Sequence, residues 1–265
     1  MLLKLIMNRN SYLLFFLYLI IFPSCSIGKT VSNLNKINYK VKLDTVTFFD
    51  HNRSRSIPLA IYKPVLGRQK AKQTLIIFSH GYYQNEAKSN TRYSYLTEFL
   101  ASKGFYVVSI QHELPTDSLI PNNGIPQIVR RPFWERGADN ILFVINKLKK
   151  SDLQLNYHHI VLIGHSNGGD MTALFPEKYP NVVDKIITLD NRRMALPRTK
   201  TPKVYSLRSS DQPADKGVLP NKKEQNVFGM KIIPLLNTFH NDMDDRANPK
   251  QQHEIRNYVL SFLNE

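Results

Sequence analysis

Hydrophobic side chains from residue 74 onward fall into short aliphatic runs separated by segments of helical spacing. The runs predict strands at 74–81, 105–113, 159–164, 184–190, 203–210 and 231–237. The segments between them predict helices at 91–104, 133–150 and 167–179, followed by a last helix at 249–265. Strands that alternate with helical crossovers indicate an α/β fold, with a mostly parallel sheet covered by helices on both faces.

Two earlier segments, 40–50 and 57–64, alternate between apolar and polar side chains in the manner of half-exposed strands. Their closeness along the chain predicts an antiparallel pair that extends one edge of the sheet. Residues 114–133 contain four prolines and follow neither period, so they predict a long irregular excursion. Loops of this length are usually functional in compact domains, and we expect this one to form a wall of a binding cleft.

The first 40 residues differ from this pattern. Lys4 and Arg9 precede an apolar run from Tyr12 to Phe22, which is short for a bilayer-spanning helix and typical of the core of a secretory signal. The single cysteine, Cys25, follows in the stretch FPSCS, which resembles a bacterial lipoprotein signal although Phe22 departs from the usual aliphatic residue. An ordinary secretory signal with an incidental cysteine is the alternative.

These features predict a signal at 1–25, a polar tether at 26–40 and one catalytic-sized domain at 41–265. The mature chain is then expected outside the cytoplasm, as a periplasmic or cell-envelope lipoprotein anchored to the membrane through Cys25, or as a secreted protein. One cysteine leaves no internal disulfide.

The chain is strongly basic, with a formal net charge of +15 among 265 residues. Such a charge attracts nucleic acids and anionic membranes. No zinc-finger spacing or RNP-like aromatic motif accompanies it, so we predict no nucleic-acid partner. A local basic cluster has no acidic residue between 191 and 203; we interpret it as a solvated loop, with contact to an anionic substrate or a lipid headgroup as the alternative. Its members are Arg192, Arg193, Arg198, Lys200 and Lys203.

The stretch VLIGHSNGGD (161–170) carries the main candidate chemistry. Its Gly-x-Ser-x-Gly pattern becomes specific because a predicted strand precedes Ser166 and a predicted helix follows it. A reversal this sharp strains the serine backbone, and Gly164 and Gly168 remove side chains that would collide across the turn. Ser166 Oγ then projects above the carboxyl edge of the sheet, and the backbone N–H of Asn167 points to where an oxyanion would form.

From about residue 74 onward the chain therefore resembles the α/β-hydrolase superfamily. FSHGYYQN (78–85) is similar to the His-Gly loop of that superfamily, which implies that the backbone N–H of Tyr82 is the second oxyanion-hole donor. In the family the catalytic base follows the nucleophile near the end of the chain. This implies His240, in LLNTFHNDMDD, just beyond the last predicted strand.

Three other histidines lie in the sequence next to the nucleophile or at the ends of predicted strands, so their roles must also be considered. His112 also ends a strand on the cleft side, which makes it the rival to His240 as the base, but it is expected to line the pocket. His80 precedes the nucleophile and is expected to be structural, and His165 is expected to point away from the site. The acidic residues that follow His240 suggest a metal site, but no second His or Cys is placed to complete one. We therefore predict neither a metal nor a cofactor.

The acid that would orient His240 has two candidates. Asp190 ends the strand after the nucleophile helix, whereas Asp211 follows the next strand, the commoner position in the family. Several stretches together resemble the platelet-activating-factor acetylhydrolase and dienelactone-hydrolase-like branch: FSHG, SIQHE, GHSNGG, TLDNRRMALP and NTFHNDMDD. In the acetylhydrolases the acid follows the earlier strand, which favours Asp190. Arg192 and Arg193 nearby could instead make Asp190 a structural ion-pair partner, and Asp215 is a third, more distant candidate.

Together these features predict a serine hydrolase that cleaves carboxylic esters through a Ser-His-Asp triad and an acyl-enzyme. Its substrate would be a small-molecule or lipid ester. Cleavage of an amide or peptide by the same residues is one alternative, and a non-catalytic binding protein on the same fold is another.

Overall fold

The structure is a computed structural model that describes residues 38–67 and 72–265. The predicted signal, Cys25 and nearly all of the predicted tether lie outside the described residues. Within the described part, no helix combines the length and the apolar character needed to span a membrane.

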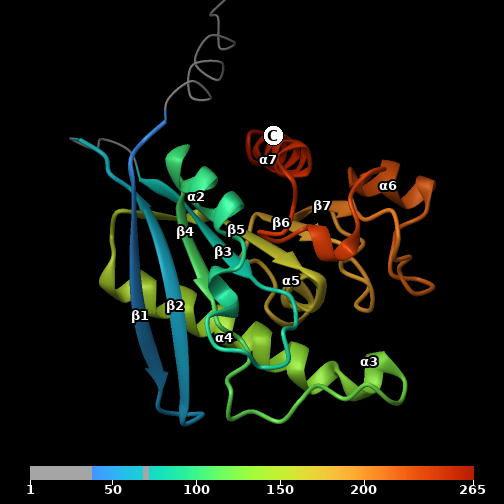
Figure 1. Cartoon of the computed structure of the whole chain (residues 1–265), viewed down its shortest axis with the longest axis horizontal. Helices are drawn as coiled ribbons and strands as arrows, with labels where there is room; N and C mark the ends of the chain where they lie inside the picture. Colours follow the sequence, from blue (N-terminus) through green and yellow to red (C-terminus); the bar gives the residue numbers. More distant parts are fainter. Residues whose placement is uncertain (1–37, 68–71) are drawn as a thin grey trace, which may run out of the picture.

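The described residues form one eight-stranded sheet, in the order β1-β2-β4-β3-β5-β6-β7-β8. The β1–β2 and β2–β4 pairs are antiparallel, and all pairs from β4 to β8 are parallel, as the sequence predicts. Figure 1 shows the β1–β2 pair at one edge of the sheet. The strands are β1 (Val41–Asp50), β2 (Arg55–Pro64), β3 (Gln73–Ser79), β4 (Tyr106–Ile110), β5 (Leu155–His165), β6 (Lys185–Leu189), β7 (Lys203–Arg208) and β8 (Lys231–Pro234).

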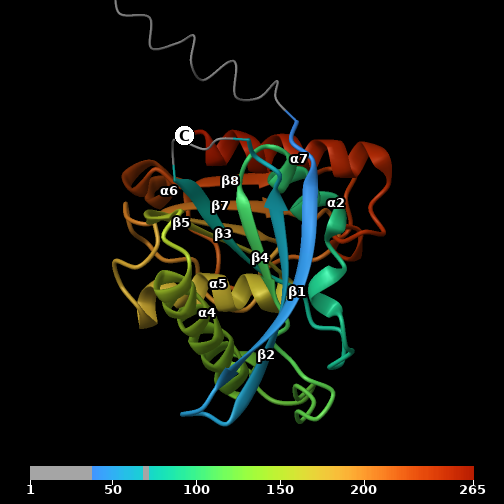
Figure 2. The ribbon, with the colours of Figure 1, turned by 90° about the vertical axis from the view of Figure 1, so that its left-hand side faces the viewer.

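Helices cover both faces of this sheet. Figure 2 shows α2 and α7 on one side and α4 and α5 on the other. The helices are α2 (Ser94–Ser102), α3 (Pro126–Val129), α4 (Arg131–Ser151), α5 (Ser166–Lys178), α6 (Lys222–Phe228) and α7 (Pro249–Leu263), with 3-10 turns η1 (Ser89–Thr91) and η2 (His240–Asp242). The predicted helices are all present, and the predicted excursion at 114–133 contains the short helix α3 and the first turn of α4.

Two hydrophobic cores follow from this layering, one on each face of the sheet. Along β3, Leu75 and Ile77 pack into the core under α4 and α5, whereas Ile76 and Phe78 pack into the core under α2 and α7. Successive strand residues point to opposite faces, so a strand covered on both sides is apolar at every position. This double burial explains the unbroken aliphatic runs in the sequence.

The strand register brings the functional segments to one edge of the sheet. His165 at the end of β5 pairs with Leu189 of β6, and Leu189 pairs with Leu207 of β7. The residues that follow these strands therefore leave the sheet side by side at its carboxyl edge, where ligands bind in open α/β sheets.

The first turn of α5 packs directly against the ends of the central strands. A Cβ atom added to Gly168 would lie 2.3 Å from the carbonyl oxygen of Ser79 and 2.4 Å from that of His80. A Cβ on Gly164 would lie 2.3 Å from the carbonyl oxygen of Gly168. The two glycines thus allow backbone to meet backbone, as the sequence pattern predicts.

We expect Gly168→Ala to destabilise the fold by about 3 kcal/mol, because the added methyl group meets two backbone carbonyls that cannot rotate away. Thermal denaturation should show a melting temperature lower by about 6–12 °C. Gly67→Ala is the matched control, since no described residue lies within 4 Å of the methyl group it adds. Equal melting temperatures for the two variants would contradict this account of the turn.

Candidate active site

Ser166 occupies a strained position at the strand-to-helix turn. It follows the last residue of β5 directly and begins α5, with a φ of 53°. This left-handed conformation is uncommon for residues with a side chain and costs on the order of 1–3 kcal/mol. The turn predicted from Gly164 and Gly168 is therefore present, and it holds the serine at the carboxyl edge of the sheet.

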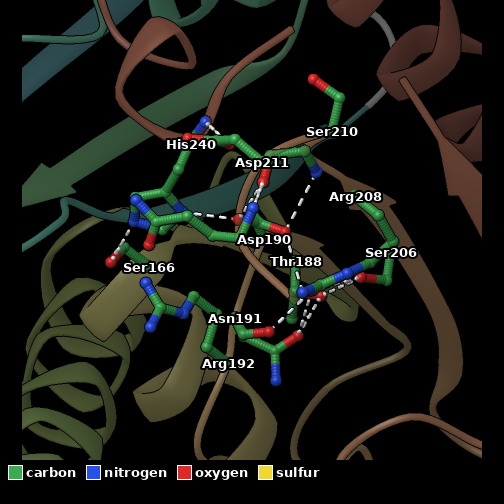
Figure 3. Close-up of polar contacts among 12 residues, drawn as sticks. Ser166, Thr188, Asp190, Asn191, Arg192, Ser206, Arg208, Ser210, Asp211 and His240 are labelled. Atoms are coloured by element: carbon green, nitrogen blue, oxygen red, sulfur yellow. Dashed lines mark hydrogen bonds and ion pairs between the residues drawn. The ribbon is translucent and has the colours of Figure 1, made fainter. Parts of the chain in front are cut away.

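Three side chains from separate segments meet in one hydrogen-bonded line (Figure 3). His240 Nε2 lies 2.9 Å from Ser166 Oγ, and His240 Nδ1 lies 2.5 Å from Asp190 Oδ2. Asp190 follows β6, and His240 begins η2 in the loop between β8 and α7. The His240 imidazole therefore lies between a hydroxyl and a carboxylate, and each ring nitrogen contacts one of them.

Asp190 is completely buried and well supplied with partners. Its carboxylate accepts hydrogen bonds from the backbone N–H and the hydroxyl of Ser209, and Arg208 Nη2 lies 2.8 Å from it. Burial alone would raise the pKa of Asp190, but the hydrogen bond with His240, the charge of Arg208 and the Ser209 hydroxyl outweigh it and lower that pKa. The carboxylate is therefore ionised beside the imidazole.

Asp211 contacts the same histidine at a different place. Its Oδ1 accepts a hydrogen bond of 2.7 Å from the backbone N–H of His240, whereas the ring nitrogens are hydrogen-bonded to Asp190 and Ser166. The predicted arginine neighbours also differ from expectation: the backbone N–H groups of Arg192 and Arg193 donate to Asp170, and Asp215 pairs with Arg193 at 3.2 Å. Arg208, which the sequence analysis did not single out, is the cation that pairs with Asp190.

His165 does not point away from the site, so that prediction is wrong. Its ring lies 4.7 Å from the His240 ring, and its Nε2–H donates to the His240 carbonyl at 3.1 Å, while Nδ1 accepts from the Tyr93 hydroxyl. Burial, followed by the nearby His240, lowers the pKa of His165 to about 3, so it is neutral. Together with Asp211, His165 holds both backbone polar groups of His240.

His80 has the structural role predicted for it, whereas His112 does not line an open pocket. His80 Nδ1 lies 2.6 Å from the Gly81 carbonyl, and its Nε2 accepts the backbone N–H of His112. Burial lowers the pKa of His80 to about 4. The His112 side chain is only 1% exposed and contacts the Ser79 hydroxyl at 3.0 Å, so it belongs to the polar interior behind the end of β3.

The two predicted oxyanion donors lie on segments close to Ser166. A Cβ on Gly81 would lie 3.5 Å from the Ser166 Cβ, so the loop that contains Tyr82 approaches the nucleophile. The Asn167 side chain is fixed on both sides: its Oδ1 accepts from Trp134 Nε1 at 2.8 Å, and its Nδ2 donates to Glu113 at 3.1 Å. The backbone N–H groups of Tyr82 and Asn167 remain the predicted donors.

The acids that follow His240 are engaged elsewhere. Asp244 pairs with Arg246, Asp245 accepts from the backbone N–H groups of Ser94 and Tyr95, and Asp242 contacts Gln251. Among the described residues, no group of three or more His, Cys, Asp or Glu side chains is placed to hold a metal ion.

Glu113 is an ionisable group near the site that the sequence analysis missed. Its side chain is 1% exposed, and its Oε2 has no hydrogen-bond partner in the described part of the chain, with His80 Nε2 3.8 Å away. Burial is the main cause that raises the pKa of Glu113 from 4.5 to about 7. Among the described residues, its contact with Asn167, far away in the sequence, is the one hydrogen bond that connects it to the nucleophile turn, so no local pattern could have identified it.

Glu113 should make stability depend on pH. In the unfolded chain it loses its proton near pH 4.5, but in the folded protein only near pH 7, so the free energy of unfolding falls between these values as pH rises. The full cost above pH 7 is about 3 kcal/mol. Glu113→Gln removes this titration, and we expect the variant to gain about 3 kcal/mol relative to wild type between pH 4 and pH 8, measured by urea unfolding.

Glu98→Gln is the control for this measurement, because Glu98 is exposed on α2. Its stability relative to wild type should change little over the same range. A constant difference between Glu113→Gln and wild type at all pH values would show that Glu113 does not titrate as described.

The chain matches no protein-family model and no curated protein sequence. Solved structures do resemble it. Esterase Est22 superposes with a TM-score of 0.61 at 12% identity, over 84% of this chain and 81% of that one. A bacterial heroin esterase gives 0.62 at 12% identity, over 88% and 87% of the two chains. A hyperthermophilic esterase from the archaeon Pyrobaculum calidifontis gives 0.61 at 11% identity, over 89% and 87%.

Sequence identities this low carry information about the fold alone. The strand order, the parallel pairing from β4 to β8 and the helices on both faces agree with this similarity. The chain therefore has the α/β-hydrolase fold.

Proposed function

We propose that this protein is a serine hydrolase of carboxylic esters, with Ser166 as nucleophile, His240 as general base and Asp190 as the triad acid. The observation that carries the proposal is the continuous line from Asp190 through His240 to Ser166, with contacts of 2.5 and 2.9 Å. The strained backbone of Ser166 supports it, because such strain concentrates at functional sites.

In the proposed reaction, Ser166 Oγ attacks the ester carbonyl while His240 Nε2 takes the hydroxyl proton. Asp190 stabilises the imidazolium through Nδ1–H, and the backbone N–H groups of Tyr82 and Asn167 stabilise the oxyanion. When the tetrahedral intermediate collapses, His240 gives its proton to the leaving alcohol and the acyl group stays on Ser166. A water molecule, deprotonated by His240, then attacks the acyl-enzyme. The bond between the acyl carbon and Ser166 Oγ breaks, His240 returns the proton to Oγ, and the acid is released.

Esters are favoured over amides because the similar structures named above are those of esterases. We further propose a likeness to the acetylhydrolase branch, since the acid next to His240 follows β6, the earlier of the two strands. Peptide cleavage would use the same three residues, so comparison of matched ester and amide substrates distinguishes the two activities.

We expect Ser166→Ala to lower the hydrolysis of p-nitrophenyl acetate and butyrate by at least about 10³-fold, because no other nucleophile in the described part of the chain hydrogen-bonds to His240 Nε2. Covalent labelling by a fluorophosphonate probe should also disappear. Ser151→Ala, an exposed change on α4, should keep both signals. Labelling that persists in Ser166→Ala, or a wild type that hydrolyses no ester, would contradict the proposed function.

Substitution of Asp190 and of Asp211 should lower kcat to very different extents. Asp190→Asn should lower kcat by about 10⁴-fold, because an amide favours the wrong imidazole tautomer and does not stabilise the imidazolium. Asp211→Asn keeps an oxygen that can accept the His240 backbone N–H, so we expect less than about a tenfold loss in kcat. Equal losses in the two variants would overturn the assignment of Asp190.

A further inference from the structure

Two arginine side chains near the nucleophile have no ion-pair or hydrogen-bond partner among the described residues. They are Arg130 and Arg192, both partly buried. Their sequence neighbours are paired: Arg131 contacts Glu135 and Glu177, both at 2.9 Å, and Arg193 contacts Asp215. The Arg192 Nε atom is shielded from solvent and makes no hydrogen bond with any described residue. A guanidinium nitrogen that is shielded from solvent without a partner carries a desolvation cost, which a bound anion would offset.

Arg192 is held close to Ser166 by backbone contacts. Asp170 Oδ1 accepts the backbone N–H groups of Arg192 at 3.2 Å and of Arg193 and Met194 at 2.9 Å. Asp170 lies one turn along α5 from Ser166, a rise of roughly 6 Å. An arginine side chain spans a comparable distance, and in Figure 3 the Arg192 side chain extends toward the Ser166 end of the triad.

Arg130 approaches the same place from the 114–133 excursion. It lies between α3 and α4, one turn before Trp134, whose indole N–H donates to the side chain of Asn167. Gln127 of α3 contacts the Arg193 carbonyl at 3.3 Å, so the excursion packs against the segment after β6. Burial, followed by the charge of Arg193, lowers the pKa of Arg130; Arg192 acts in the same direction, whereas Asp170 opposes it. Arg130 therefore lies in the excursion that packs against the segment carrying Arg192 and Arg193.

Among the described residues, neither nearby acid forms an ion pair with Arg130 or Arg192. Asp170 is occupied by three backbone N–H groups, and Asp215 by Arg193 and Gln127. Guanidinium groups bind carboxylate and phosphate oxygens in a paired geometry that ammonium groups do not offer.

We propose that Arg130 and Arg192 form a subsite for an anionic group, a carboxylate or a phosphate, on the ester that Ser166 cleaves. The subsite rests on the proposed function and adds a substrate class to it: esters with a negative charge on the acyl or alcohol part. A neutral ester leaves both cations unpaired, and sites built around buried polar groups discriminate strongly against ligands that lack the partner.

The test compares charged and neutral esters of matched shape. The acyl pair is mono-4-nitrophenyl adipate against its methyl ester, and the alcohol pair is 4-acetoxyphenyl phosphate against 4-methoxyphenyl acetate. We expect wild type to favour the charged member of at least one pair. The double variant Arg130→Gln/Arg192→Gln should lose at least about 30-fold in kcat/KM for that member, mainly through KM, and less than about threefold for the neutral one. The retained neutral activity shows that the variant folds.

Arg131→Gln is the matched control, since it removes a neighbouring guanidinium that is already paired. It should leave the charge preference unchanged. Losses that are equal for charged and neutral esters would overturn the subsite while leaving the esterase intact. A charge preference in the acyl pair would indicate a carboxylate site, and a charge preference in the alcohol pair would indicate a phosphate site.

A binding measurement on a variant that lacks the nucleophile tests the subsite independently of ester hydrolysis. In the Ser166→Ala protein, titration calorimetry with adipate and with phenyl phosphate should show binding of at least one anion, abolished by the double arginine change and kept by Arg131→Gln. Absence of binding, or binding that survives the double change, would overturn the subsite even if wild type hydrolyses no ester at all.

Discussion

The close approach of α5 to the ends of the central strands is the constraint on which the site depends. Helix and strand backbones meet without intervening side chains at Gly164 and Gly168, and this contact turns the chain so sharply that Ser166 has a left-handed conformation. The loop that contains Gly81 and Tyr82 is brought against the same turn. A proposed nucleophile and its oxyanion donors are thereby fixed by one packing contact rather than by flexible loops.

Around that turn, the polar groups that position His240 come from different parts of the chain. Asp190 contacts the ring, Asp211 accepts the backbone N–H, and His165 donates to the carbonyl. These three residues follow or end β6, β7 and β5, which lie next to one another in the sheet. The parallel register therefore places all three at the carboxyl edge of the sheet. Their contacts, rather than the loop between β8 and α7 itself, position the His240 imidazole.

Much of this architecture could be predicted from sequence because it depends on local signals. Strands covered on both faces are apolar at every position, and the serine turn requires small residues at fixed spacing. Strand ends were less predictable: β5 begins at Leu155, ahead of the predicted start, because Gln73 and Thr74 of β3 pair with its first residues before a register shift. That pairing is nonlocal and leaves no mark on hydrophobic periodicity.

The site was harder to predict for the same reason. Asp190 and Asp211 both follow strands at the carboxyl edge, so only their distances to His240 distinguish them. His165, Glu113 and Arg208 act through contacts with residues distant in sequence, and no spacing rule points to them. Contacts between buried polar residues of this kind depend on the tertiary structure, and their positions in the sequence follow neither the helical nor the strand period.

The left-handed backbone of Ser166 has an evolutionary consequence. Glycine adopts this conformation at little cost, so Ser166→Gly would relax the turn while removing the hydroxyl. Selection for persistence of the fold alone would therefore favour descendants that lose the chemistry. A serine retained at this position would therefore indicate continued selection for catalysis, because glycine would be the more stable residue in this backbone conformation.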